Sequence, residues 1–116
     1  MTTKSSAVHD PGPGFTVIYR WRLNEGMEAQ FIEAWSQVSR LLREKRGSLG
    51  SRLHLGSDGI WYSYAQWPSA ATRAKSAALP PVDPDAKRRM SDSVREELPE
   101  IELHSISDFL VLPGDA

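Results

Sequence analysis

The chain has 116 residues, of which 14 are lysine or arginine and 15 are acidic, and it contains no cysteine. This length suits one domain whose core is small enough for dimerisation to help. A net charge of -1 disfavours binding to nucleic acid or to an anionic membrane, and the lack of cysteine excludes disulfides, thiolate metal sites and a cysteine nucleophile. Residues 1–14 contain no apolar run of a signal peptide, so we expect a flexible tail and a cytoplasmic protein.

An alternating strand is predicted at residues 15–23, followed by an amphipathic helix between Gly26 and Gly47. Aromatic and aliphatic side chains occupy one face of the strand: Phe15, Val17, Tyr19, Trp21 and Leu23. A period of two is typical of a sheet covered on one side. The helix has one apolar stripe: Met27, Phe31, Ala34, Trp35, Val38, Leu41 and Leu42. We therefore expect the helix to cover the strand, with Phe31 and Trp35 as core residues rather than site residues.

The remaining chain predicts three strands and a helical region in two parts. Asp58-Gly59 between two strand-like runs indicates a tight hairpin. Asp83-Pro84 is an N-cap followed by proline, which indicates a helix start, and Pro99 is expected to end that helix. The predicted elements are strands at 50–55 and 60–67, helices at 70–79 and from Pro84 to Leu98, and a last strand at 101–112.

The resulting order, β-α-β-β-α-β with a central hairpin, is typical of the ferredoxin-like α+β fold, with a four-stranded antiparallel sheet and helices on one face. We expect one domain at residues 15–112, with tails at 1–14 and 113–116. The other face of the sheet would expose Ile18 and aromatic side chains, which is unusual in a monomer. A homodimer that buries sheet against sheet is the simplest solution.

Two runs, VIYRWRLNEGMEAQFIEAW at 17–35 and RGSLGSRLHLGSDGIWYSYAQWPS at 46–69, resemble the antibiotic biosynthesis monooxygenase-like family of the dimeric α+β barrel superfamily. Gly26 before the helix and Trp67 at the end of the third strand carry the resemblance. It implies a dimeric fold and one of several activities: oxygenation of polycyclic aromatic substrates without metal or flavin, haem degradation, or no assigned reaction. The haem branch is disfavoured, because Tyr19 stands where its members carry asparagine and residues 70–81 contain neither tryptophan nor histidine.

We therefore expect a cofactor-independent monooxygenase acting on an aromatic small molecule. Such a site needs aromatic walls, exclusion of water and stabilisation of a substrate anion. The candidate walls are Tyr19, Trp21, Trp67 and Tyr64, and the candidate catalytic residues are His54 and Arg52. Sequence does not decide which face of the third strand lines the pocket, although Trp67 is preferred. No histidine and carboxylate cluster has metal-ligand spacing, so neither a metal nor a cofactor is expected.

Two alternatives remain open. A non-catalytic dimer of the same fold would bind a small metabolite or act only as a scaffold, and a proton-transfer enzyme such as an isomerase would work without oxygen. The space beneath the first helix discriminates among them. A cavity with at least two convergent polar groups favours catalysis or binding, whereas a packed interior favours the scaffold.

Overall fold

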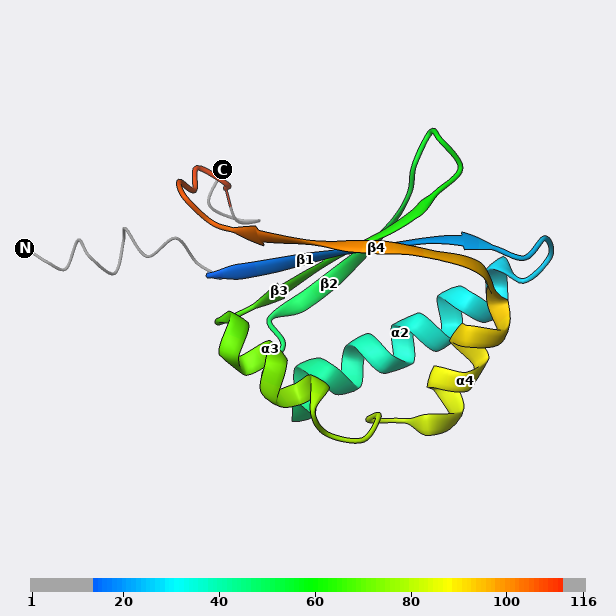
Figure 1. Cartoon of the computed structure of the whole chain (residues 1–116), viewed down its shortest axis with the longest axis horizontal. Helices are drawn as coiled ribbons and strands as arrows, with labels where there is room; N and C mark the ends of the chain where they lie inside the picture. Colours follow the sequence, from blue (N-terminus) through cyan, green and yellow to red (C-terminus); the bar gives the residue numbers. More distant parts are fainter. Residues whose placement is uncertain (1–13, 112–116) are drawn as a thin grey trace, which may run out of the picture.

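The computed structural model describes residues 14–111, so the predicted tail at 113–116 and all of the predicted tail at 1–14 except Gly14 lie outside the described part of the chain. Three helices cover one face of a four-stranded antiparallel sheet with strand order β2-β3-β1-β4 (Figure 1). The elements are β1 Phe15–Leu23, α2 Glu28–Lys45, β2 Gly50–Leu55, β3 Trp61–Trp67, α3 Ala70–Ala77, α4 Pro84–Ser93 and β4 Val94–His104. This is the ferredoxin-like arrangement predicted from the sequence, which is therefore confirmed.

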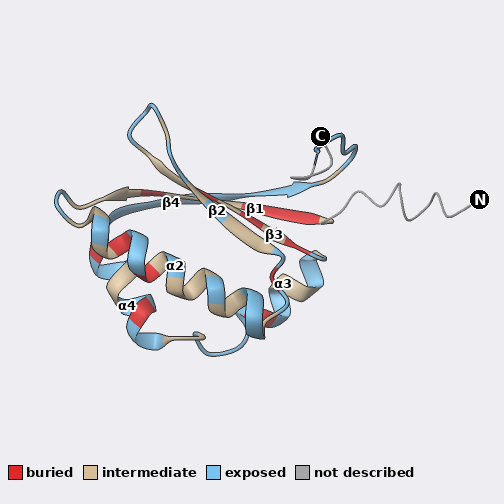
Figure 2. Cartoon of the chain, turned by 180° about the vertical axis from the view of Figure 1, so that it is seen from behind, coloured by how far each residue is buried: buried red, intermediate tan, exposed pale blue. Residues whose placement is uncertain are grey.

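The central strand β1 joins the two halves of the sheet, because it pairs with β3 on one side and β4 on the other. Phe15, Val17 and Trp67 form a buried cluster on its helix-facing side. In Figure 2 buried segments lie on β1, on β3 and on helices α2 and α4. The alternation of β1 thus places its aromatic residues under the helices, as the pattern predicted.

Helix α2 is the main cover of the sheet. The chain reaches it through Gly26 and leaves it through Gly47, both with positive φ angles, 84° and 83°, that glycine adopts at little cost. Phe31 and Ala34 are fully buried beneath the helix. The ring of Phe31 meets Trp21 edge-on at a centroid distance of 5.0 Å and Trp61 at 6.3 Å. These contacts fix the helix over the aromatic part of the sheet.

The boundary between α4 and β4 differs from the prediction. The helix ends at Ser93 rather than Leu98, and residues 94–98 already belong to a strand. The strand ends at His104 rather than Leu112, and of the expected remainder residues 105–111 have no regular structure. Pairing of β4 with β1 decides both ends, since the ladder runs from Leu23 opposite Val94 to Phe15 opposite His104.

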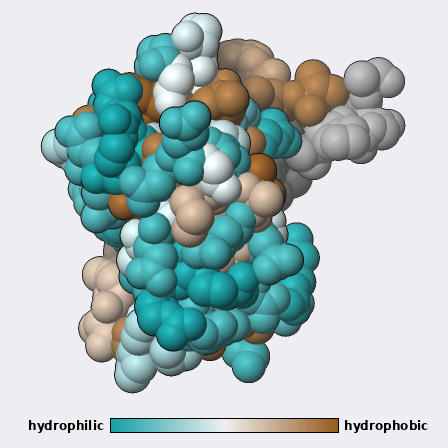
Figure 3. Space-filling view, turned by 90° about the vertical axis from the view of Figure 1, so that its right-hand side faces the viewer, coloured by the Kyte–Doolittle hydropathy of each residue, from teal (hydrophilic) through white to brown (hydrophobic). Residues whose placement is uncertain are grey.

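The sheet face turned away from the helices, here called the open face, carries both apolar and cationic side chains. Ile101 and Leu103 of β4 lie on it, 42% and 43% exposed, because their register partners are Ile18 and Thr16. Elsewhere, the surface seen from the end that holds α4 is mostly hydrophilic (Figure 3). Among residues 14–111 no helix has the length and apolar character needed to cross a membrane.

Candidate functional site

A cavity of about 330 Å³ lies between the helix-facing side of the sheet and helices α2 and α4. This volume is at the lower end of the range for small-molecule sites. Four aromatic residues form much of its wall: Tyr19, Trp21, Trp35 and Trp67. Ser63, Lys87 and Glu97 are among its polar lining residues. The interior beneath α2 is therefore hollow, lined by rings and by several polar groups.

The aromatic wall is built from strand alternation and from rings packed on one another. Tyr19 and Trp21 are two residues apart on β1, so both side chains point to the helix-facing side. Their rings are stacked, with centroids 6.0 Å apart and planes within 9°. The edge-on contact of Phe31 supports Trp21 from behind. A flat ring entering the cavity would thus meet an ordered aromatic surface.

Trp67 supplies a hydrogen-bond donor that the protein leaves unused. Its side chain is only 3% exposed, and within residues 14–111 its Nε1 is buried without any partner. Trp35 shows the usual arrangement, because its Nε1 donates to Ser63 Oγ at 3.1 Å. An unmade hydrogen bond of a buried donor is costly, and Nε1 itself has almost no accessible surface, so other atoms of the Trp67 ring line the cavity. Ser63 accepts from Trp35 and retains its own hydroxyl hydrogen as a second donor.

A charged network holds Tyr19 from the side of α3. Arg73 Nη2 donates to Tyr19 Oη at 3.1 Å, and its guanidinium lies 5.6 Å from the centre of the tyrosine ring. Glu100 at 2.9 Å and Glu102 at 3.5 Å pair with the same guanidinium. Burial raises the pKa of Tyr19, an effect that Arg73 opposes in part. The phenol therefore stays protonated at neutral pH, and its hydrogen is free to be donated to a ligand oxygen.

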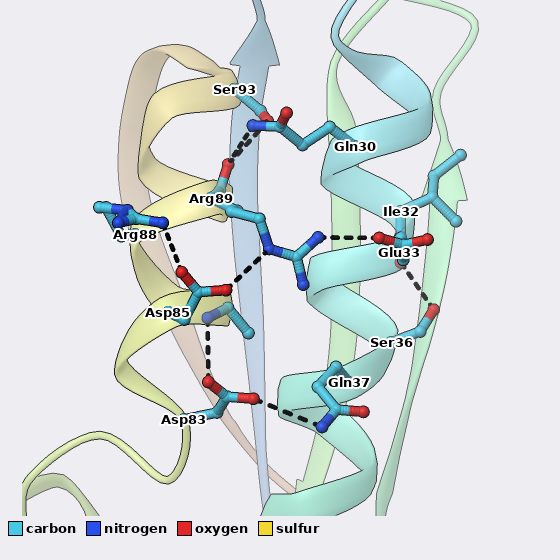
Figure 4. A network of polar contacts seen from close by, with 11 residues as sticks. Gln30, Ile32, Glu33, Ser36, Gln37, Asp83, Asp85, Arg88, Arg89 and Ser93 are labelled. Carbon is cyan, nitrogen blue, oxygen red and sulfur yellow. Dashed lines mark hydrogen bonds and ion pairs between the residues drawn. The ribbon is translucent and has the colours of Figure 1, made fainter.

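Helix α4 forms the other wall of the cavity and is held against α2 by polar contacts (Figure 4). Arg89 Nη1 pairs with Glu33 Oε1 at 2.8 Å. Gln30 Nε2 donates to the backbone oxygen of Arg89 at 3.1 Å and to Ser93 Oγ at 3.2 Å. These contacts run along the length of α4, so the spacing between the two helices, and with it the width of the cavity, is set by polar pairs on the outer side.

A second hollow of about 340 Å³ lies beside the first and shares Tyr19 and Glu97 with it. Arg20, Pro99 and Glu100 also line this hollow. The guanidinium of Arg20 donates to the backbone oxygen of Pro99 at 2.8 Å and 3.1 Å, at a point where the β1–β4 register shifts. Tyr19 and Glu97 therefore stand between the aromatic cavity and the irregular part of β4.

The structure brings together only some of the residues predicted for the site. Tyr19, Trp21 and Trp67 line the cavity. Arg52 of β2 stands opposite Tyr64 of β3 in the strand register. Both lie on the open face, because the residues that precede them, Ser51 and Ser63, line the cavity from the helix-facing side.

His54 is two residues from Arg52 on β2 and lies on the open face as well. The sheet thus separates the predicted pair His54 and Arg52 from the aromatic wall, and in one protomer they do not meet Tyr19 or Trp67. Any role for them in catalysis stays a prediction.

Sequence reasoning missed several lining residues. Trp35 was assigned to the core because it follows Phe31 by one helical turn, yet it is half-buried and faces the cavity. Glu97 was expected within the helix from Pro84 to Leu98, whereas it lies on β4 opposite Trp21. Lys87, in the same predicted helix, was not singled out and also lines the cavity. The sequence signal for Glu97 is that a polar residue is followed by the apolar Leu98. This signal indicates that Glu97 and Leu98 lie on opposite faces of a strand only when residues 94–98 are predicted as a strand. Within residues 14–111 no three histidine, aspartate or glutamate side chains gather as a metal site would require.

Comparison with known proteins finds similarity to this chain among solved structures. No protein-family model matches the sequence, and no curated protein matches it. SnoaB, a cofactor-independent oxygenase from Streptomyces nogalater, is similar with a TM-score of 0.69 and 12% identity over 84% of this chain and 98% of its own. A conserved protein from Methanosarcina mazei Go1 gives a TM-score of 0.69 and 7% identity over 83% of this chain and 96% of its own.

A structure described as an antibiotic biosynthesis monooxygenase gives a TM-score of 0.65 and 12% identity over 79% of this chain and 98% of its own. Each neighbour is covered almost completely by this one domain. At these identities the likeness concerns the fold, and function has to be argued from the site. The chain therefore has the fold of the antibiotic biosynthesis monooxygenases, and the resemblance seen in residues 17–35 and 46–69 is confirmed at that level.

Proposed function

We propose that this protein is a cofactor-independent monooxygenase that oxidises an aromatic small molecule in the cavity between the sheet, α2 and α4. The observation that carries the proposal is the cavity of about 330 Å³ with four aromatic residues in its wall. A cavity of this kind supports ligand binding over a purely scaffolding role. The cofactor-independent oxygenase among the structural neighbours supports the reaction class by analogy of fold.

The chemistry requires little from the protein because the substrate is its own reductant. The proposed substrate is an electron-rich phenol whose keto tautomer carries an activated ring methylene. Loss of a proton gives a phenolate-like anion, which transfers electrons to dioxygen. The methylene carbon then loses two hydrogens and gains one oxygen atom as a carbonyl, and the second oxygen atom leaves as water. Dioxygen is the only co-reactant, so atoms and electrons balance.

Each lining residue has a role in this proposal. Tyr19, Trp21 and Trp35 hold the ring and exclude water. Trp67 adds a fourth ring to the wall, and the hydroxyls of Ser63 and Tyr19 are donors that stabilise negative charge on substrate oxygen as it develops. Glu97 is the carboxylate at the cavity wall and is our candidate proton acceptor. It replaces His54 in that role, because His54 lies across the sheet.

The test uses 1,8-dihydroxyanthrone, a tricyclic phenolic ketone with one activated methylene, and follows its quinone product by absorbance. In air we expect the protein to form quinone faster than the protein-free background, and under nitrogen we expect none. Quinone formation that persists without dioxygen contradicts the proposal.

The variant Trp67→Leu removes one ring from the cavity wall, and should lower kcat/KM by roughly tenfold to a hundredfold. Trp61→Leu is the matched control, because Trp61 packs on Phe31 outside the cavity. Its kcat/KM should equal that of the unaltered protein. Equal losses in both variants would mean that tryptophan packing in general, and not the wall of the cavity, matters.

We also propose that two copies pair through their open faces. The open face of one protomer exposes Ile101 and Leu103 beside Ile18 and the tyrosines of β3. A face of this character supports an isologous contact between identical surfaces. The predicted role of Arg52 and His54 would then belong to the dimer interface.

A further inference from the structure

Arg73 of α3 is a largely buried cation to which the proposed reaction assigns no role. Its side chain is 19% exposed, and it is not among the residues that line the aromatic cavity. Its guanidinium nevertheless reaches the back of the cavity wall, because Nη2 donates to Tyr19 Oη at 3.1 Å and the group lies 5.6 Å from the centre of the tyrosine ring. Arg73 therefore acts on a ligand in the cavity through Tyr19.

Two carboxylates of β4 hold the guanidinium in this place. Glu100 pairs with Arg73 Nη2 at 2.9 Å, and Glu102 pairs with Nη1 at 3.5 Å. A guanidinium held by two acids cannot turn away without leaving partly buried charges unpaired, which is costly. The contact with Tyr19 is thus one part of a network that joins α3, β1 and β4.

This network decides which way the hydroxyl hydrogen of Tyr19 points. A guanidinium has donors but no acceptor, so Tyr19 Oη accepts from Arg73 and its own hydrogen is directed elsewhere. Within residues 14–111 the hydroxyl has no other hydrogen bond, and the side chain lines the cavity, so the hydrogen is available there. A hydroxyl that accepts from a cation is also polarised into a stronger donor.

We propose that Arg73 is a positioning residue, which holds Tyr19 so that the phenol hydrogen is presented to an oxygen atom of the ligand in the cavity. This role rests on the proposed function, in which Tyr19 stabilises charge on substrate oxygen, and it adds the residue that keeps Tyr19 a donor. Without Arg73 the carboxylates of Glu100 and Glu102 would lose their partner and would compete with the ligand for the same hydrogen.

Arg46 offers a matched comparison, because it holds the same helix without contacting Tyr19. Its Nη1 donates to the backbone oxygen of Ser76 at 3.1 Å, and its Nη2 donates to that of Pro80 at 2.7 Å. Both arginines therefore anchor the α3 region to the rest of the protomer. A purely structural role for Arg73 would make the two arginines equivalent in every measurement at the cavity.

The first test measures the pKa of Tyr19 by NMR in chains labelled at tyrosine Cζ, with Tyr19→Phe to assign the signal among the three tyrosines. Burial raises the pKa of Tyr19, Arg73 lowers it, and Glu100 and Glu102 raise it. We therefore expect Arg73→Met to raise the pKa further, because burial and both carboxylates remain. Arg73→Lys keeps the cation and should hold the pKa close to that of the unaltered chain, and Arg46→Met should leave it unchanged.

The direction of the change separates positioning from structural support. Loss of support would expose the phenol to water, and the pKa of Tyr19 would fall toward its ordinary value of about 10. Such a fall in Arg73→Met, or an unchanged value, overturns the inference. Glu97 and Lys87, the other charged residues that line the cavity, are the same in every variant. Circular dichroism establishes that each variant is folded.

The second test is a double-mutant cycle on binding of 1,8-dihydroxyanthraquinone, a flat ligand with carbonyl oxygens that needs no turnover. Quenching of tryptophan fluorescence gives its Kd. We expect Arg73→Met and Tyr19→Phe each to raise Kd by about fivefold to tenfold, and the double variant to raise it no further, because Arg73 acts through Tyr19. Arg46→Met should bind as the unaltered chain does. Losses that multiply in the double variant overturn the inference.

The outcomes distinguish this inference from the proposed reaction. Neither the pKa nor the Kd depends on dioxygen, so both expected results without any quinone formation from the anthrone would contradict the reaction and leave the role of Arg73 standing. Conversely, oxygen-dependent turnover with an unchanged Kd in Arg73→Met, or with no binding of the anthraquinone, would leave the reaction standing and overturn the role of Arg73.

Discussion

At the scale of single residues, the hydrogen-bond donors of the cavity wall differ in whether they have a partner within the protein. Trp35 and Trp67 are both indoles at the wall, but one is bonded to Ser63 and the other has no partner in residues 14–111. Tyr19 is intermediate, since it accepts from Arg73 and keeps its own hydrogen. The hydroxyl hydrogens of Ser63 and Tyr19 therefore remain for a ligand, whereas Trp67 Nε1 is too deeply buried to reach one, and this favours ligands with acceptor oxygens.

The raised pKa of Tyr19 makes a prediction about alkaline stability. Because burial disfavours the folded phenolate, the stability associated with Tyr19 is complete below its unfolded pKa near 10 and is lost as the pH rises through the higher folded value. We expect Tm to fall between pH 9 and 11 and Tyr19→Phe to reduce that fall. Tyr64→Phe, a change on the open face, keeps Tyr19 and should show the same fall in Tm as the unaltered protein. An equal fall in all three proteins would contradict the assignment.

At the scale of elements, the polar ends and sides of α4 decide the width of the cavity. Asp83 caps the helix, with its carboxylate accepting from Ala86 N at 3.1 Å, and its other oxygen accepts from Gln37 of α2 at 3.4 Å. The cap and the Arg89–Glu33 pair hold the two helices together. Loss of either should widen the cavity as well as loosen the fold.

Removal of the cap is the corresponding prediction. Asp83→Ala should lower Tm by about 5 °C at pH 7, whereas Asp83→Asn, which keeps an acceptor oxygen, should lower it by less. Hydrogen bonding from Ala86 lowers the pKa of Asp83, so the carboxylate stabilises the fold above its unfolded pKa near 4 and this is lost as the pH falls through the folded value. The deficit of Asp83→Ala should therefore shrink below pH 4. A deficit that is independent of pH would exclude the charged cap as its cause.

The α4–β4 boundary also shows how far the sequence could lead. The strand and helix order, the hairpin at Asp58-Gly59 and the aromatic face of β1 were predicted correctly, because each is encoded by local spacing. Ala86, Met90, Val94 and Leu98 recur every four residues, and a spacing of four suits a helix and also one face of a strand. Pairing with β1, which no local pattern reveals, decided in favour of the strand.

The same limit applies to the candidate site. Tyr19, Trp21 and Trp67 were found because alternation places them under the helices, and family likeness singled out Tyr19 and Trp67. Glu97 was missed because its strand was taken for a helix. Arg52 and His54 were chosen for their chemistry without knowledge of their face, and register alone puts them on the other side of the sheet from the cavity.

At the scale of the whole molecule, helices cover one face of the sheet and leave the other face uncovered. If the open faces pair, unfolding is coupled to dissociation, and Tm must rise with protein concentration. We expect a rise of several degrees between 1 and 100 µM, measured by scanning calorimetry. A Tm independent of concentration in the unaltered chain would contradict pairing.

Tyr19 and Glu97 stand between the aromatic cavity and the hollow beside Pro99, where β4 departs from regular pairing. Arg20, which donates to the backbone oxygen of Pro99, belongs to the open face, so in the proposed dimer the partner would lie against a residue that is bonded to this part of β4. Guest and partner are then thermodynamically linked: whatever factor pairing adds to the affinity for the guest, the guest must add to pairing.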